Sequence, residues 1–207
     1  NQNKKILDKI NFKIKKNEKV GILGETGSGK STLLNLIMGF LHPGNGNIFI
    51  DNSNLKNNIL AWQKLIGYVP QSIYILDDTL KKNITFQSDE KLIDFGLLEK
   101  SIENSGLSDF LKKQTNRYET ILGERGSKIS AGEILRIGLA RAYYSKAKVF
   151  ILDEFTSSLD IETENKLLDI INNIKKTFVI VSHKQNSLKY CDRILQLKNS
   201  KIIEEQK

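Results

Sequence analysis

Residues 24–32, Gly-Glu-Thr-Gly-Ser-Gly-Lys-Ser-Thr, have the residue types and spacing of a phosphate-binding loop, G-x-x-x-x-G-K-[ST]. The glycines allow backbone conformations in which consecutive N–H groups point toward one anion. Lys30 adds a full positive charge for the β- and γ-phosphates, and the Ser31 hydroxyl is suited to ligating Mg²⁺. We therefore expect a nucleoside triphosphate to be bound by Gly24, Glu25, Thr26, Gly27, Ser28, Gly29, Lys30, Ser31 and Thr32.

The elements that flank this loop are those that the motif requires. The apolar run at residues 20–23 predicts a buried strand, and the run at residues 32–38 predicts a helix. The start of that helix adds N–H donors without intrahelical partners and the positive end of a dipole. A flexible glycine-rich turn is the alternative interpretation, and a Lys-Ser pair at a helix start argues against it.

A second set of candidate residues follows two other apolar runs. Residues 149–152 predict a strand that ends in Asp153 and Glu154. Phosphoryl transfer needs charge neutralisation and an in-line nucleophile, so Asp153 is suited to the Mg²⁺ shell and Glu154 to polarising water. His183 follows the apolar run at 178–181, at a strand end where ligands bind in open α/β sheets. We predict Glu154 and His183 as catalytic; a solvated acid pair and a structural histidine are the alternatives.

Composition limits the class of protein. The chain has 207 residues, enough for one sizeable domain, and contains no apolar run of the roughly 18–20 residues that cross a bilayer. It begins at Asn1 rather than Met, and we expect a piece of a longer polypeptide. Its single cysteine, Cys191, excludes an internal disulfide framework and is typical of a reducing compartment. The net charge of +8 is compatible with a nucleic-acid surface or an anionic membrane face. Because the lysines are dispersed, an ordinary solvated surface is favoured.

The periodicity of the apolar residues changes along the chain. Short strands are predicted at residues 12–14, 47–50 and 66–69, in addition to the buried runs above. From about residue 77 to 143 the period is helical. Strands therefore enclose an inserted helical block, and the predicted class is α/β.

Taken together, the motifs resemble the nucleotide-binding domain of an ATP-binding cassette (ABC) transporter over nearly all of the chain. The landmarks fall in the family's order: the phosphate loop, Gln71, the signature Ser130-Ala131-Gly132-Glu133, Asp153-Glu154 and His183. Residues 157–160 are similar to the family's D-loop. Residues 67–71, 76–84 and 123–126 are similar to the pattern of exporters.

The resemblance implies a fold in three parts. It implies a P-loop NTPase (RecA-like) core with a small antiparallel β subdomain, formed by residues 1–75 and 144–207. An inserted α-helical subdomain, residues 76–143, would carry the signature. A transmembrane domain would lie upstream, outside this chain.

The resemblance also implies a mechanism with ATP and Mg²⁺ as cofactors. The metal would be held by Ser31, Gln71 and Asp153. Two such domains, copies of one another in a homodimer, would close head to tail around two ATP molecules. Ser130, Gly132 and Glu133 of one signature would face the phosphate loop of the other. Ser158 and Asp160 would lie in the D-loop at the dimer contact.

Closure and hydrolysis would then power export or flipping by an attached transmembrane domain. The implied location is the cytoplasmic face of a membrane, and we expect this to be the bacterial inner membrane. No nucleic acid is expected as a partner. Residues 189–194 are similar to flippases of lipid-linked oligosaccharides. Peptide or toxin secretion and lipid or drug export remain open.

Three departures from the family pattern bear on activity. Ala131 and Glu133 replace residues of the usual L-S-G-G-Q signature and add a methyl group and a negative charge. Phe155 stands where a small residue is usual. No aromatic residue precedes the segment at 6–10, so we expect the adenine-stacking residue to lie upstream of Asn1.

Two other function classes remain as alternatives. One is a soluble ABC ATPase that acts on nucleic acid or in translation, which would use the positive charge. The exporter-like residues 123–126 and the short spacing between phosphate loop and signature argue against it. The other is a regulatory cassette that does not hydrolyse ATP, and the presence of both Glu154 and His183 argues against that.

Overall fold

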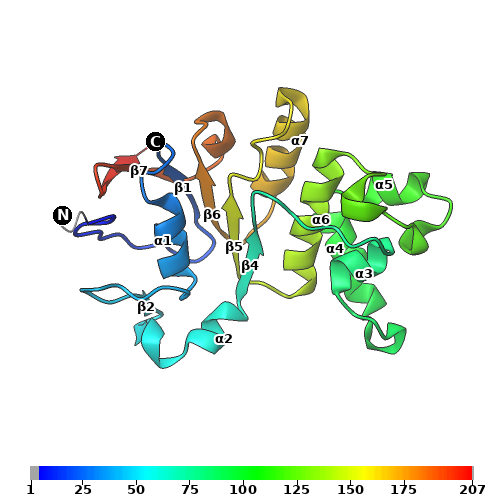
Figure 1. Ribbon diagram of the computed structural model, residues 1–207, viewed down its shortest axis with the longest axis horizontal. Helices are drawn as coiled ribbons and strands as arrows, with labels where there is room; N and C mark the ends of the chain where they lie inside the picture. The colour runs from blue at the N-terminus through cyan, green and yellow to red at the C-terminus, as the bar shows by residue number, and fades with distance from the viewer. Residues whose placement is uncertain (1–4, 207) are drawn as a thin grey trace.

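A six-stranded sheet forms the centre of the computed structural model, which describes residues 5–206 (Figure 1). The strand order is β4-β5-β6-β1-β7-β8; the first five strands are parallel, and β8 is antiparallel to β7. The strand bounds are β1 Lys19–Leu23, β4 Ile66–Val69, β5 Val149–Asp153, β6 Thr177–Ser182, β7 Arg193–Lys198 and β8 Lys201–Gln206. The predicted α/β class with a parallel sheet is confirmed, as are the strands predicted from the buried apolar runs.

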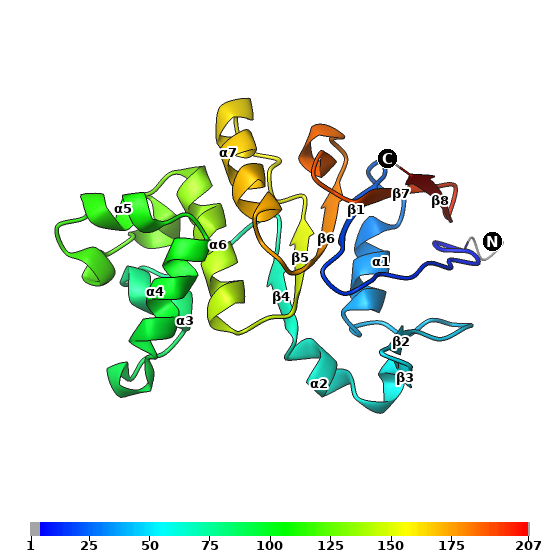
Figure 2. The ribbon, with the colours of Figure 1, turned by 180° about the vertical axis from the view of Figure 1, so that it is seen from behind.

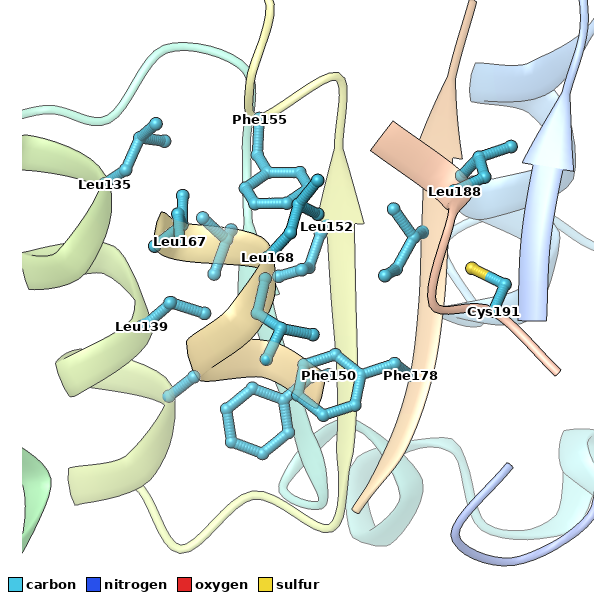
Figure 3. Packing of buried hydrophobic residues seen from close by; sticks show 14 of the residues in the cluster. Leu135, Leu139, Phe150, Leu152, Phe155, Leu167, Leu168, Phe178, Leu188 and Cys191 are labelled. Atoms are coloured by element: carbon cyan, nitrogen blue, oxygen red, sulfur yellow. The ribbon is translucent and has the colours of Figure 1, made fainter. Parts of the chain in front are cut away.

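Both faces of this sheet are covered, which explains why its strands are continuously apolar. Helix α1 (Lys30–Ile37) packs on one face, where Ile151 contributes to an apolar cluster with residues of β1, β6 and α1. Helices α6 (Ala131–Tyr144) and α7 (Ile161–Asn172) pack against the other face. Successive side chains of a strand point to opposite faces, so Phe150 and Leu152 join this second cluster (Figure 3). The reverse view shows α1 and α6 on different sides of the sheet (Figure 2).

A helical block extends beyond the β4 edge of the sheet (Figure 1). It contains α3 (Leu80–Thr85), α4 (Phe95–Asn104) and α5 (Ser108–Lys113), which pack with one side of α6 around a separate apolar cluster. Helix α6 belongs to both clusters, because Leu135 and Leu139 face the sheet while Ile137 and Ala140 face the block. The subdomain boundaries at residues 75/76 and 143/144 stay a prediction.

The predicted small antiparallel sheet consists of β2 (Phe49–Ile50) and β3 (Ser53–Asn54). The strand predicted at residues 47–50 is therefore shorter than expected. The strand predicted at residues 12–14 was wrong: the segment pairs with no strand within residues 5–206, although Phe12 and Ile14 pack against the α1-side cluster. The alternation of apolar and polar residues there arises because one side of an extended segment is buried, and not because the segment belongs to a sheet.

The remaining elements are short. Helix α2 spans Ile59–Gln63. The 3₁₀ turns are η1 Leu55–Asn57, η2 Glu90–Leu92, η3 Arg117–Glu119, η4 Glu124–Gly126 and η5 Asn186–Leu188. Across residues 5–206, no helix combines the length and the apolar character that crossing a membrane requires.

Candidate active site

Four neighbouring parallel strands end at the same edge of the sheet, and each is followed by a predicted site segment. The phosphate loop follows β1, Gln71 follows β4, Glu154 follows β5 and His183 follows β6. The register aligns these ends, since Leu23 lies opposite Ser182 and Asp153 lies opposite Val181. Loops at the carboxyl ends of such strands are where open α/β sheets bind ligands.

The phosphate loop has the backbone shape that its sequence predicts. Gly27 and Gly29 have φ values of 80° and 105°, in the left-handed region that favours glycine. A Cβ added at Gly24 would lie 2.9 Å from the carbonyl oxygen of Leu197, which is too close. Helix α1 starts with no side-chain cap and no acid in its first turn. Its first N–H groups and dipole therefore remain available to an anion.

Lys30 is buried at the centre of this loop, with 6% of its surface exposed. Its Nζ donates to the carbonyl oxygens of Gly24 at 2.8 Å and Glu25 at 2.9 Å. It also lies 3.4 Å from Oε1 of Glu154. The Ser28 hydroxyl is buried and has no hydrogen-bond partner among the described residues. A buried cation and an unpaired hydroxyl beside an uncapped helix start fit the phosphates of a nucleotide.

Glu154 lies between Lys30 and His183. Its Oε1 is 3.7 Å from Nδ1 of His183. The backbone of Glu154 has a φ of 45°, and its N–H donates to the carbonyl of Val181 at 2.9 Å. The structure thus brings together a buried ammonium, a carboxylate and an imidazole from segments that follow three different strands. This arrangement can neutralise phosphate charge and orient a water.

Asp153 has a different environment from its neighbour. Burial raises its pKa, although Tyr68 donates a hydrogen bond from its hydroxyl to Oδ2 at 3.2 Å. Burial, and to a smaller extent the charge of Asp153 and this hydrogen bond, raises the pKa of Tyr68 to about 12. The sequence places Tyr68 in a predicted strand and in the exporter-like segment 67–71, and it does not predict this hydrogen bond to Asp153. No local sequence pattern marks this contact, because it depends on the pairing of β4 with β5, which places the two strand ends side by side.

The oxygen donors at this edge of the sheet suit Mg²⁺ rather than a metal ion whose ligands all come from protein side chains. Among residues 5–206, no group of three or more His, Cys, Asp or Glu side chains could hold a metal. At phosphate sites Mg²⁺ needs only one or two carboxylates, with phosphate and water oxygens completing its shell. The Asp153 carboxylate and the Ser31 hydroxyl supply oxygen ligands of this kind.

The signature residues lie apart from the phosphate loop of the same chain, since α6 and α1 are on opposite sides of the sheet (Figures 1 and 2). Ser130 is the N-cap of α6 and forms a capping box with Glu133. Oε2 of Glu133 accepts from the Ser130 N–H at 2.8 Å and from its hydroxyl at 2.9 Å. A Cβ added at Gly132 would lie 2.8 Å from Cγ2 of Thr163, so glycine allows α6 to approach α7.

Two of the other predicted site residues, Gln71 and Ser158, lie near Ala131 of the signature. Gln71, Ala131 and Ser158 line a cavity of about 200 Å³. Gln71 is exposed and makes no hydrogen bond to the phosphate loop within residues 5–206. Asp160 caps α7, where the backbone N–H of Thr163 lowers its pKa. The roles of Gln71, Ser158 and Asp160 stay predictions.

Phe155 has a clear structural place. It is 1% exposed and inserts between β5 and α7 in the same cluster as Leu152 and Leu168 (Figure 3). Cys191 is buried in this cluster as well, which agrees with a structural cysteine.

Comparison with known proteins identifies the family. Residues 7–157 match the family described as ABC transporter. The chain belongs to the ABC transporter family, and the predicted resemblance is confirmed. In structure, it is similar to a bacterial Atm1-family ABC exporter with ATP bound, with a TM-score of 0.85, 27% identity and coverage of 100% of this chain and 36% of that one. The P-loop core and helical insertion are thus those of an exporter-type nucleotide-binding domain.

Two relatives extend this comparison. The ATP-dependent lipid A-core flippase of Wigglesworthia glossinidia brevipalpis is 38% identical over 201 residues, covering 96% of this chain and 34% of the relative. The alpha-hemolysin translocation ATP-binding protein HlyB of Escherichia coli is 37% identical over 209 residues, covering 98% and 29%. The chain spans about a third of the length of these relatives.

Proposed function

We propose that this chain is the ATP-binding and ATP-hydrolysing motor domain of an ABC exporter. The observation that carries the proposal is the convergence of Lys30, Glu154 and His183 at one sheet edge, beside an uncapped helix start. Phosphoryl transfer depends on this kind of positioning and charge neutralisation. Membership of the family supports the same function.

Each residue has a separate task in the proposed reaction. Lys30 and the N–H groups at the start of α1 neutralise the β- and γ-phosphates. Glu154 orients and polarises the attacking water, and His183 contacts the γ-phosphate from the next strand end. Ser31, Asp153 and Gln71 would hold Mg²⁺, which supplies further charge neutralisation when bound.

The signature points to a second copy of the domain. Ser130, Gly132 and Glu133 stand at the start of α6, whose dipole suits a phosphate, yet they lie far from this chain's own phosphate loop. In a head-to-tail pair they would complete the site of the partner, with Ser158 and Asp160 at the contact. Closure of such a pair, at the cytoplasmic face of a membrane, would drive an attached transmembrane domain.

The transported substrate is proposed only by analogy. A lipid A-core flippase and a hemolysin translocation protein are similar to this chain to nearly the same degree. The flippase-like residues 189–194 make contacts inside the domain, since Lys189 bonds Asn165, Tyr190 bonds Asp169, and Cys191 is buried. These contacts explain the segment without reference to substrate, and lipid flipping remains one hypothesis beside protein and drug export.

The test is a comparison of ATP turnover and ATP binding. We expect Glu154→Gln to lower kcat at least 100-fold while keeping nucleotide affinity, because the carboxylate polarises water but does not bind phosphate. Lys30→Ala should instead weaken ATP binding at least tenfold, because it removes a buried charge partner. Equal ATPase rates in wild type and Glu154→Gln would show that the proposed function is wrong.

A further inference from the structure

A buried polar cluster, formed in part by residues that closely follow Glu154 and His183 in the chain, has no part in the reaction proposed above. It consists of Thr156, Glu164 and Ser187, which are 2%, 3% and 1% exposed. The Thr156 hydroxyl donates to Oε1 of Glu164 at 2.9 Å, and the Ser187 hydroxyl donates to the same oxygen at 2.6 Å. The two hydroxyl oxygens lie 2.9 Å apart. We refer to these three residues as the hydroxyl–carboxylate cluster.

The members of this cluster come from the two catalytic loops and from the helix between them. Thr156 is two residues beyond Glu154, and Ser187 is four residues beyond His183. Glu164 lies on α7, which follows the first loop in sequence. A carboxylate on α7 therefore joins the loop that carries Glu154 to the loop that carries His183.

An apolar anchor stands beside each hydroxyl. Phe155 precedes Thr156 and Leu188 follows Ser187, and they are 1% and 0% exposed. Both belong to the apolar cluster that also contains Leu167 and Leu168 of α7, and Figure 3 shows Phe155 near β5 and Leu188 near β6. Each loop is thus fixed by one apolar side chain and one buried hydrogen bond.

The backbone of Glu154 needs such a constraint. Its φ of 45° lies in the left-handed region, which costs energy for a residue with a side chain. Conformations of this kind persist only where the surroundings hold them in place. Phe155 and Thr156, which follow Glu154 directly, fix this conformation through the burial of one side chain and the hydrogen bond of the other.

We propose that the hydroxyl–carboxylate cluster positions Glu154 and His183 relative to one another, so that its members act as positioning residues for hydrolysis. This inference deepens the proposed function and relies on it for the turnover test. Loss of a buried hydroxyl shifts the loop without removing any group that touches the nucleotide. Small displacements of catalytic groups lower kcat by up to about 100-fold.

The first test separates turnover from binding. Thr156→Val keeps the shape of the side chain but removes the hydroxyl, and we expect kcat to fall about tenfold with the nucleotide Kd within about twofold. Thr156→Ser restores the hydroxyl and should recover most of kcat. Ser101→Ala is the matched control, because Ser101 is also buried and its hydroxyl bonds the Leu97 carbonyl of its own helix, away from the site. An unchanged kcat in Thr156→Val, or no recovery in Thr156→Ser, would overturn the proposal.

The second test uses hydrogen exchange of the wild-type and variant domains and does not depend on hydrolysis. Ser187→Ala changes only the loop after β6, yet we expect faster amide exchange in residues 154–158 of the other loop. Thr156→Val should reciprocally increase exchange in residues 183–188. Changes confined to the substituted loop would contradict the coupling even if ATPase activity is normal. Coupled exchange without wild-type ATPase activity would instead support the positioning and reject the proposed function.

Discussion

Two adjacent carboxyl groups show how the environment assigns different tasks to similar residues. Glu154 faces the Lys30 ammonium and the His183 imidazole, so it can act on a water between them. Asp153 is half-buried, and burial raises its pKa despite the hydrogen bond from Tyr68. Its charge is therefore unfavourable unless a cation balances it. This environment suits a ligand of Mg²⁺. Without the bound ion, the charged Asp153 carboxylate lowers the stability of the folded domain.

We predict that Asp153→Asn stabilises the domain while weakening Mg²⁺-nucleotide binding. A raised carboxyl pKa means that the folded state loses stability as the pH rises through that value, so the charged form is the destabilising one. The substitution should raise Tm by roughly 1–3 °C at neutral pH, with a smaller gain at acidic pH where the wild-type carboxyl is protonated. Asp77→Asn, on an exposed side chain, is the control. A lower Tm at neutral pH would argue against this account.

At the level of the secondary-structure elements, the first residues of α6 have to cap the helix and also, in the proposed pair, attract phosphate. Glu133 completes the capping box, and its carboxylate accepts hydrogen bonds from both the N–H and the hydroxyl of Ser130. The box stabilises the helix start, yet the carboxylate places a negative charge where the proposed partner site needs to attract phosphate. Glutamine at this position can form the same box without the charge.

We therefore expect Glu133→Gln to promote the proposed head-to-tail pairing. In a Glu154→Gln background, the ATP concentration for half-maximal dimerisation should fall about three- to tenfold, which corresponds to roughly 1 kcal/mol. Light scattering across an ATP titration measures this, with Glu99→Gln on the exposed surface of α4 as control. A higher ATP requirement would show that the carboxylate assists rather than opposes closure.

Elements buried on both sides could be predicted from sequence, whereas those defined by long-range pairing could not. The strands β5 and β6 are continuous apolar runs because helices cover both faces of the sheet. Residues 12–14 alternate in the same way as a strand but pair with no strand in the described part of the chain. The double role of α6 was also missed, because its apolar residues spread over two clusters instead of one stripe.

The same contrast applies to the site. Lys30 could be predicted from the phosphate-loop motif at the start of α1, and Asp153, Glu154 and His183 because each stands at or just after the end of a recognisable strand. Their mutual distances depend on the strand order β4-β5-β6-β1, which joins segments far apart in the chain and leaves no local pattern. Tyr68 and the hydroxyl–carboxylate cluster depend on that order as well, so they emerged only from the structure.

At the scale of the whole molecule, the two halves of the proposed site do not meet. The phosphate loop leads into α1 on one side of the sheet, and the signature begins α6 on the other (Figure 1). One chain cannot bring the two together without breaking the clusters between them. Two chains related head to tail would bring each signature to the other's phosphate loop, provided that the nucleotide favours the closed pair over the open one.

This proposal predicts an ATP-dependent change of mass. Glu154→Gln should shift from monomer to dimer when ATP and Mg²⁺ are added, because bound nucleotide would be retained between the two chains. Light scattering measures the shift, and adding Lys30→Ala to the same variant should abolish it by removing the phosphate contact. A dimer that forms equally without ATP would contradict the nucleotide-bridged arrangement. A persistent monomer would mean that closure needs a segment outside this chain or a partner with a different signature.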